Sequence, residues 1–76
     1  MDMLTIRRAE ALFASDLPTG AAPAPAQVVS AVRAAVRRYG GTRGCVAELA
    51  HAYGDYPETA AARMRWACRV AEGLAS

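Results

Sequence analysis

The residues of this chain best suited to binding chemistry are its arginines. All nine basic side chains are arginine, against seven acids, and the formal net charge is +2. The segment between Asp16 and Glu48 contains arginines and no acid. Neighbouring guanidinium groups can bind phosphate or an acidic protein surface. A solvated helix face is the alternative interpretation. The four arginines of this segment are Arg33, Arg37, Arg38 and Arg43.

The chain lacks the residue patterns of catalytic and metal sites. Cys45, His51 and Cys68 do not have zinc-binding spacing, because a Cys-x-x-Cys pair and a fourth ligand are missing. No serine or cysteine is spaced with a histidine base, and the glycine-rich stretch 40–44 follows no predicted strand and precedes no lysine. We therefore expect a protein that is not an enzyme, without cofactor, metal or small-molecule substrate, with His51 at the surface and both thiols buried.

The hydropathy pattern predicts a cytoplasmic protein. No apolar run of about 18 residues is present, so no membrane span is expected. The N-terminal sequence MDMLTIRRAEALF lacks the basic start and continuous apolar stretch of a signal peptide. In the cytoplasm the cysteines would stay reduced.

The elements that must position the arginines are all predicted to be helices. The chain has 76 residues and 19 alanines, and alanine has the highest helix propensity. These features predict one all-α domain, a small bundle of three to four helices. Alanine buries little area, so we expect the few larger apolar residues to form the core, and a homodimer or other partner to add burial.

The N-terminal third is predicted to be a helix over residues 3–15 followed by a linker over 17–24. Leu4, Leu12 and Phe13 lie on the apolar side of this helix, and prolines and a glycine interrupt the linker. We assign residues 1–24 to this N-terminal helix and Pro/Gly/Ala linker. The sequence leaves open whether the helix docks on the other helices or contacts another chain.

A core of three helices is predicted over residues 25–76. The first starts at Pro25 and ends at Gly40 and Gly41, and the second covers 43–53 with Thr42 as its N-cap. Helical periodicity predicts which side chains of these two helices face inward. They are Val28, Val29, Val32, Val36 and Tyr39 in the first, and Val46, Leu49, Ala50 and Tyr53 in the second, with Glu48 outward.

The last predicted helix covers residues 57–74. Asp55 and Glu58 have capping-box spacing, and Pro57 suits the first helical turn. Apolar residues then repeat at intervals of four and three, which predicts a single buried seam. The seam consists of Ala60, Met64, Ala67, Ala71 and Leu74.

The stretch LAHAYGDYPETAAARMRWA, residues 49–67, has the spacing of a helix-turn-helix. A small residue, Ala50, precedes Gly54 by four positions, and Thr59 opens the second helix. This stretch resembles the helix-turn-helix in region four of bacterial sigma factors. The resemblance implies a helix-turn-helix over 44–72 whose second helix lies in the major groove of promoter DNA. It also implies that Thr59 contacts the DNA backbone and Arg63 a phosphate or a guanine edge.

Residues 43–67 also resemble small uncharacterised proteins of high-GC actinobacteria of the Streptomyces type, which share an Arg-Gly-Cys and a Pro-Glu-Thr-Ala segment. This resemblance implies a source and a compartment and carries no activity. A GC-rich genome would also account for the abundance of arginine and alanine.

Two functions follow from these patterns. The first is a small DNA-binding or transcription-associated regulatory protein, whose partner is DNA or a transcription-related protein. The alternative is a non-catalytic helical interaction module, either homodimeric or bound to another protein, with a degenerate helix-turn-helix. The alanines that open the last helix favour this alternative. Met64 and Trp66 would then mark the interface, with core packing as the other interpretation of Trp66.

Overall fold

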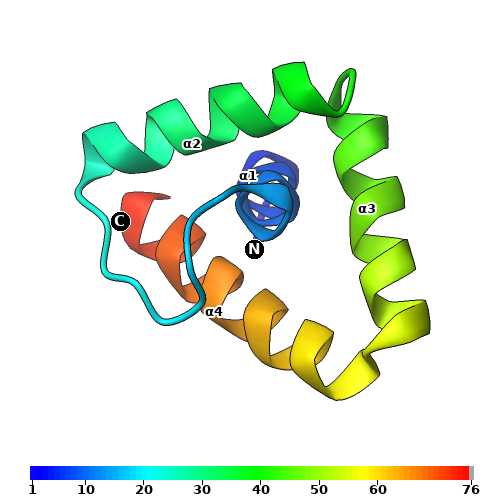
Figure 1. The fold of residues 1–76 in the computed structure, drawn as a ribbon. Coiled ribbons are helices and arrows are strands. Elements are labelled where there is room, and N and C mark those ends of the chain that lie inside the picture. Colours follow the sequence, from blue (N-terminus) through cyan, green and yellow to red (C-terminus); the bar gives the residue numbers. More distant parts are fainter. Residues whose placement is uncertain (76) are drawn as a thin grey trace.

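The computed structural model describes residues 1–75, with side chains to Leu74, and contains four helices (Figure 1). No strand occurs among these residues, which confirms the all-α class. The helices are α1 (Met3–Ala14), α2 (Pro25–Arg38), α3 (Thr42–Asp55) and α4 (Pro57–Ala75).

The N-terminal helix α1 lies at the centre of the molecule. Figure 1 views it along its axis, with α2, α3 and α4 arranged around it, and it packs against all three. Its last turn is buried on every side, because the four consecutive residues Ala11–Ala14 are all buried. A helix that is apolar all round must be covered on all sides. The helix therefore docks on the other three, and the core is shared by all four helices rather than confined to residues 25–76.

Seven of the twelve buried apolar residues are alanines, so alanine contributes more of the described core than expected, beside the larger Leu12, Phe13, Val28, Cys45 and Trp66. Leu12 and Cys45 are the largest fully buried side chains. Because alanine side chains are short, the outer helices can approach α1 closely, and this close approach compensates for the small area that each alanine buries. The buried alanines are Ala9, Ala11, Ala14, Ala35, Ala60, Ala67 and Ala71.

Helix α2 begins at Pro25 and ends in a glycine pair, both as predicted. Gly40 has a φ of +74°, and the Gly41 amide donates to the Val36 carbonyl oxygen at 2.8 Å. This is the Schellman arrangement, in which a residue of positive φ ends a helix. The inward side of α2 is predicted less well, because Val29, which was expected to face the core, is exposed, whereas Ala35 is buried against α1.

The corner between α2 and α3 depends on Gly44. A Cβ atom added at Gly44 would overlap the Tyr39 carbonyl oxygen and lie 2.9 Å from the Tyr39 Cβ. The end of α2 can therefore approach the first turn of α3 only because residue 44 has no side chain. The N-cap of α3 is Gly41, so the prediction of Thr42 as the cap is wrong by one residue.

Helix α3 faces the core with a different side from the predicted one. Cys45 is 1% exposed, and Leu49 and Ala52 pack against the core, whereas Ala50 and Tyr53 are exposed. The reason is that α3 packs mainly against α1. The position of α1 cannot be inferred from the spacing of apolar residues within α3.

Helices α3 and α4 are joined by a single residue, Tyr56. Gly54 does not have a positive φ and lies within α3, so it is not the residue that turns the chain. A helix-turn-helix usually has a turn of three or four residues. Asp55 ends α3, and the residue that precedes α4 is Tyr56, so the predicted capping role of Asp55 is wrong. The apolar seam of α4 is confirmed, with Ala60, Ala67 and Ala71 buried and Met64 and Leu74 packed beside them.

Candidate binding surfaces

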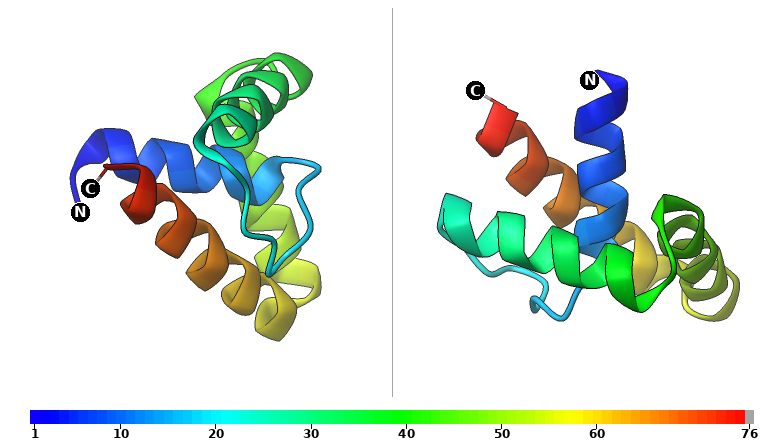
Figure 2. Two further views of the ribbon diagram at one scale, coloured as in Figure 1. Left: turned by 90° about the vertical axis from the view of Figure 1, so that its left-hand side faces the viewer. Right: turned by 90° about the horizontal axis from the view of Figure 1, so that it is seen from above.

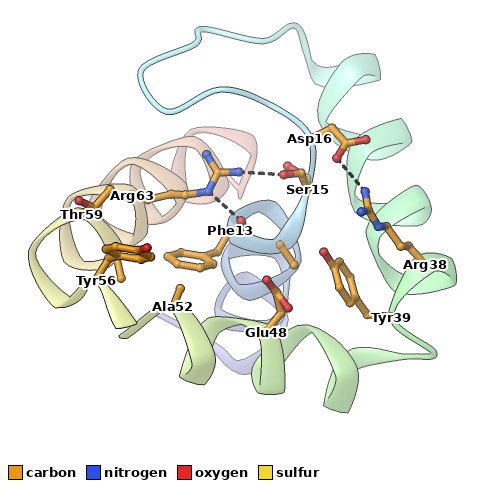
Figure 3. Close-up of a pocket in the computed structure, with 12 residues that line it drawn as sticks. Phe13, Ser15, Asp16, Arg38, Tyr39, Glu48, Ala52, Tyr56, Thr59 and Arg63 are labelled. Carbon is orange, nitrogen blue, oxygen red and sulfur yellow. Dashed lines mark hydrogen bonds and ion pairs between the residues drawn. The ribbon is translucent and has the colours of Figure 1, made fainter. Parts of the chain in front are cut away.

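Arg63 caps the C-terminal end of α1. Its Nε donates to the Phe13 carbonyl oxygen at 2.8 Å and its Nη2 to that of Ser15 at 2.9 Å (Figure 3). Nη2 also donates to the Leu12 carbonyl oxygen at 3.3 Å. Its Nη1 donates to the Thr19 hydroxyl at 2.9 Å. The final carbonyls of a helix lack partners within the helix and carry its negative dipole end. The guanidinium therefore supplies both the donors and the positive charge that this end requires.

The Arg63 guanidinium is also held by aromatic rings. It lies 4.9 Å from the centroid of the Trp66 ring and 5.6 Å from that of Phe13. Burial lowers the pKa of Arg63, although an arginine remains charged in proteins. A contact between Arg63 and a phosphate or guanine, as the resemblance implies, would require this side chain to leave α1.

Trp66 packs in the core. It is 3% exposed, and its Nε1 donates to the Ala21 carbonyl oxygen at 2.9 Å, which holds the linker after α1 against α4. Trp66 is thus placed for core packing rather than for contact with a partner. Met64 is partly exposed beside Cys68, in a shallow hollow on the outer surface of α3 and α4.

The arginines of α2 and α3 have different surroundings. Arg33, Arg37 and Arg43 are exposed and form no ion pair or hydrogen bond with residues 1–75. Arg38 pairs with Asp16 at 3.1 Å, although both side chains are largely exposed, and such a surface pair contributes little stability. Three of the four arginines in the acid-free segment are therefore free to meet an external anion.

The pocket at the C-terminal end of α1 brings together three of the predicted DNA-binding residues, Arg38, Thr59 and Arg63. It has a volume of about 340 Å³ and lies where the end of α2, the middle of α3 and the start of α4 meet (Figure 3). Arg33, Arg37 and Arg43 do not line it. The lining residues are Phe13, Ala14, Ser15, Asp16, Arg38, Tyr39, Glu48, Ala52, Tyr56, Thr59, Ala60 and Arg63.

Sequence reasoning missed the contribution of α3 to this pocket. Glu48 was expected to point outward, but Figure 3 shows it pointing into the pocket. Glu48 and Ala52 are four residues apart and lie on one side of α3, and Tyr56 follows four residues later as the residue that caps α3. That spacing is the signal in the sequence that could have grouped them.

The two thiols and the histidine differ in how far they are exposed. Cys45 is buried and Cys68 partly exposed, and burial raises the pKa of each, helped by Glu10 for Cys45 and by Glu72 for Cys68. His51 is exposed, as predicted. Within residues 1–75 no three side chains of the metal-binding types lie close enough to hold an ion. None of the described helices combines the length and apolar character needed to cross a membrane.

Comparison with known proteins assigns no function to these surfaces. No family model, curated protein or solved structure matches the chain. The resemblance to sigma factor region four therefore stays a prediction. Function has to be inferred from the exposed arginines and from the pocket.

Proposed function

We propose that this is a small, non-catalytic nucleic-acid-binding protein that contacts phosphates through Arg33, Arg37 and Arg43. The observation that supports this is that all three guanidinium groups are exposed and unpaired among residues 1–75. An unpaired surface guanidinium can bind a phosphate without first breaking an internal ion pair. Hydrogen bonds between guanidinium and phosphate are among the stronger ones in proteins.

The placement of these arginines suits a line of phosphates. Arg33 and Arg37 are four residues apart on α2, so their Cβ atoms lie roughly 5–6 Å apart on one side of the helix. Like charges at this spacing repel each other, and a bound phosphate would relieve the repulsion. Arg37 and Arg43 stand on either side of the Gly40–Gly41 turn, at a corner that Gly44 keeps tight.

The start of α4 offers less to DNA. Its exposed residues include Glu58, whose carboxylate repels phosphate, and Ala62, which has no polar group. Thr59 is exposed and can contact a backbone phosphate, but Arg63 is engaged at the end of α1. We therefore propose binding that depends on phosphates and hardly on base sequence, as in a transcription-associated rather than a promoter-reading protein.

Two double variants with the same charge change test this proposal. Arg33→Gln/Arg37→Gln removes the proposed contacts, and Arg65→Gln/Arg69→Gln removes an exposed pair at the same spacing on α4. Fluorescence anisotropy of a labelled DNA duplex is measured over roughly 50–200 mM salt. Each phosphate contact contributes about 0.9 to the slope of log affinity against log salt, so the α2 variant should lower the slope by about 1.8.

The α4 variant should leave the slope near that of the unmodified protein, and adding Arg43→Gln to the α2 variant should remove about 0.9 more. An equal decrease of the salt slope in the two double variants would show that DNA is attracted by the net charge of the protein and not by a defined site. Absence of binding at the lowest salt concentration would refute the proposed function itself.

A second function, protein interaction, is favoured by one observation. Met1, Met3 and Leu4 are each more than half exposed. Figure 2 shows that the N-terminal end of α1 projects beyond α2 and α3, on the same side as the end of α4. We propose that this apolar end forms the contact of a homodimer. Sedimentation should then show a concentration-dependent dimer that Leu4→Glu abolishes, and a monomer at all concentrations would refute it.

A further inference from the structure

The pocket at the end of α1 contains one charged group that has no partner among residues 1–75. Four charged side chains line it, of which Asp16 and Arg38 pair with each other and Arg63 binds the carbonyls of α1. The fourth, Glu48, is half-buried and has no hydrogen bond or ion pair with any residue from 1 to 75. Its carboxylate points into the pocket, towards the space between Phe13 and Tyr39 (Figure 3).

The walls of the pocket are suited to a cation. The rings of Phe13, Tyr39 and Tyr56 line it, and the face of an aromatic ring attracts positive charge. The Tyr56 ring is exposed and has no ring or cation contact among residues 1–75, whereas Arg63 already lies 5.6 Å from the Phe13 centroid and Arg38 lies 5.5 Å from that of Tyr39.

An anion would be held less well. Nε and Nη2 of Arg63 are both engaged with α1 carbonyls, and Nη1 already donates to Thr19. An anion in the pocket would find its free charged donors mainly on Arg38, which is exposed and already paired with Asp16, and would be repelled by the unpaired Glu48 carboxylate. A cation would instead gain a charge-assisted hydrogen bond from the same group.

We propose that this pocket binds a single guanidinium or primary ammonium group, which donates to Glu48 and lies against the aromatic walls. A volume of about 340 Å³ is at the small end for ligand sites and suits one such head group with its alkyl stem. The group could belong to an arginine or lysine side chain of a protein partner or to a free amine. This inference is independent of the nucleic-acid function, because Arg33, Arg37 and Arg43 do not line the pocket.

The test is an NMR titration of amide resonances with four probes: N-acetyl-arginine amide, N-acetyl-lysine amide, spermidine and inorganic phosphate. A cationic probe should shift the amide resonances of Glu48, Tyr39 and Tyr56, and these shifts should saturate as the probe concentration rises. Glu48→Gln should lower its affinity about tenfold, because a charge-assisted hydrogen bond is lost. The matched control, Glu58→Gln, alters an exposed acid outside the pocket and should bind like the unmodified protein.

The probes separate the sources of the cation. Tighter binding of the arginine or lysine amide indicates a side chain of a protein partner, and tighter binding of spermidine indicates a free amine. Glu48→Gln should keep its helical circular dichroism and melting temperature, since Glu48 has no partner to lose. Tyr56→Ala is a second variant at an exposed wall, and it should weaken binding roughly two- to fivefold.

Three results would overturn the proposal. The first is equal affinity in Glu48→Gln and the unmodified protein. The second is a set of shifts spread evenly over all surface acids, Glu58 included, which would indicate diffuse ion binding. The third is saturable movement of the pocket resonances by phosphate and not by the cationic probes.

Discussion

Replacing Arg63 with methionine tests whether this side chain holds α1 in the core. Methionine keeps an apolar stem but supplies no donor. Two of the lost hydrogen bonds are short bonds to carbonyl oxygens at the end of α1, at 2.8 Å to Phe13 and 2.9 Å to Ser15. A hydrogen bond to a charged group is worth about 1.5–3 kcal/mol, and the lower value suits a site that water can partly reach. We therefore expect a loss of about 3 kcal/mol, or a melting temperature roughly 12–24 °C lower in a chain of this size.

The assay is urea denaturation followed by far-UV circular dichroism. Arg65→Met is the matched control, because Arg65 lies two residues further along α4, is exposed and has no partner among residues 1–75. Its free energy of unfolding should stay within about 0.5 kcal/mol of the unmodified protein. Arg63→Lys should recover only part of the loss, since an ammonium cannot match the planar fork. Equal stability of Arg63→Met and Arg65→Met would refute the capping role.

Three further substitutions and one pH series probe the rest of the fold. Gly44→Ala should cost about 2–3 kcal/mol or prevent folding, because its Cβ would overlap the backbone of Tyr39, and a lower urea midpoint would show this. Gly54→Ala should instead stabilise by about 0.5–1 kcal/mol, because Gly54 is helical with open space around it, and destabilisation would restore it as the turn residue. Trp66→Phe should cost about 1–2 kcal/mol in the same assay by removing the hydrogen bond to the linker, and no loss would contradict that role. Burial raises the pKa of Cys45 above its ordinary value of 9.0, so the unfolded thiol loses its proton first. The contribution of the buried thiol to the free energy of unfolding should therefore be fully present below about pH 9 and be lost as the pH rises further. Urea titrations below and above about pH 9 measure this loss, and Cys45→Ala should reduce it.

Much of the helical framework could be predicted from the sequence because its determinants are local. Pro25 at the start of α2, the Gly40–Gly41 pair at its end and the alternating seam of α4 each act within a few residues. The pocket was only partly predictable. Arg38, Thr59 and Arg63 were singled out, but as contacts to DNA, and Glu48 was placed on the wrong side of α3. The inward side of α3 depends on where α1 lies, and periodicity within α3 does not contain that information.

The sequence by itself determined that this chain forms a bundle of three to four helices, where they begin and end to within a few residues, and that its basic side chains, Lys and Arg together, are all arginines. Propensity, capping residues and periodicity are properties of neighbouring positions, so they can be recognised without knowing the fold. Only the tertiary structure decided what those arginines do. Arg63 looks like a surface residue on the flank of an amphipathic helix, yet it meets a carbonyl 50 positions earlier in the chain. That partner exists only because short alanine side chains allow α1 to sit in the middle of the other three helices. The same packing leaves Arg33, Arg37 and Arg43 free at the surface and directs the Glu48 side chain towards the pocket.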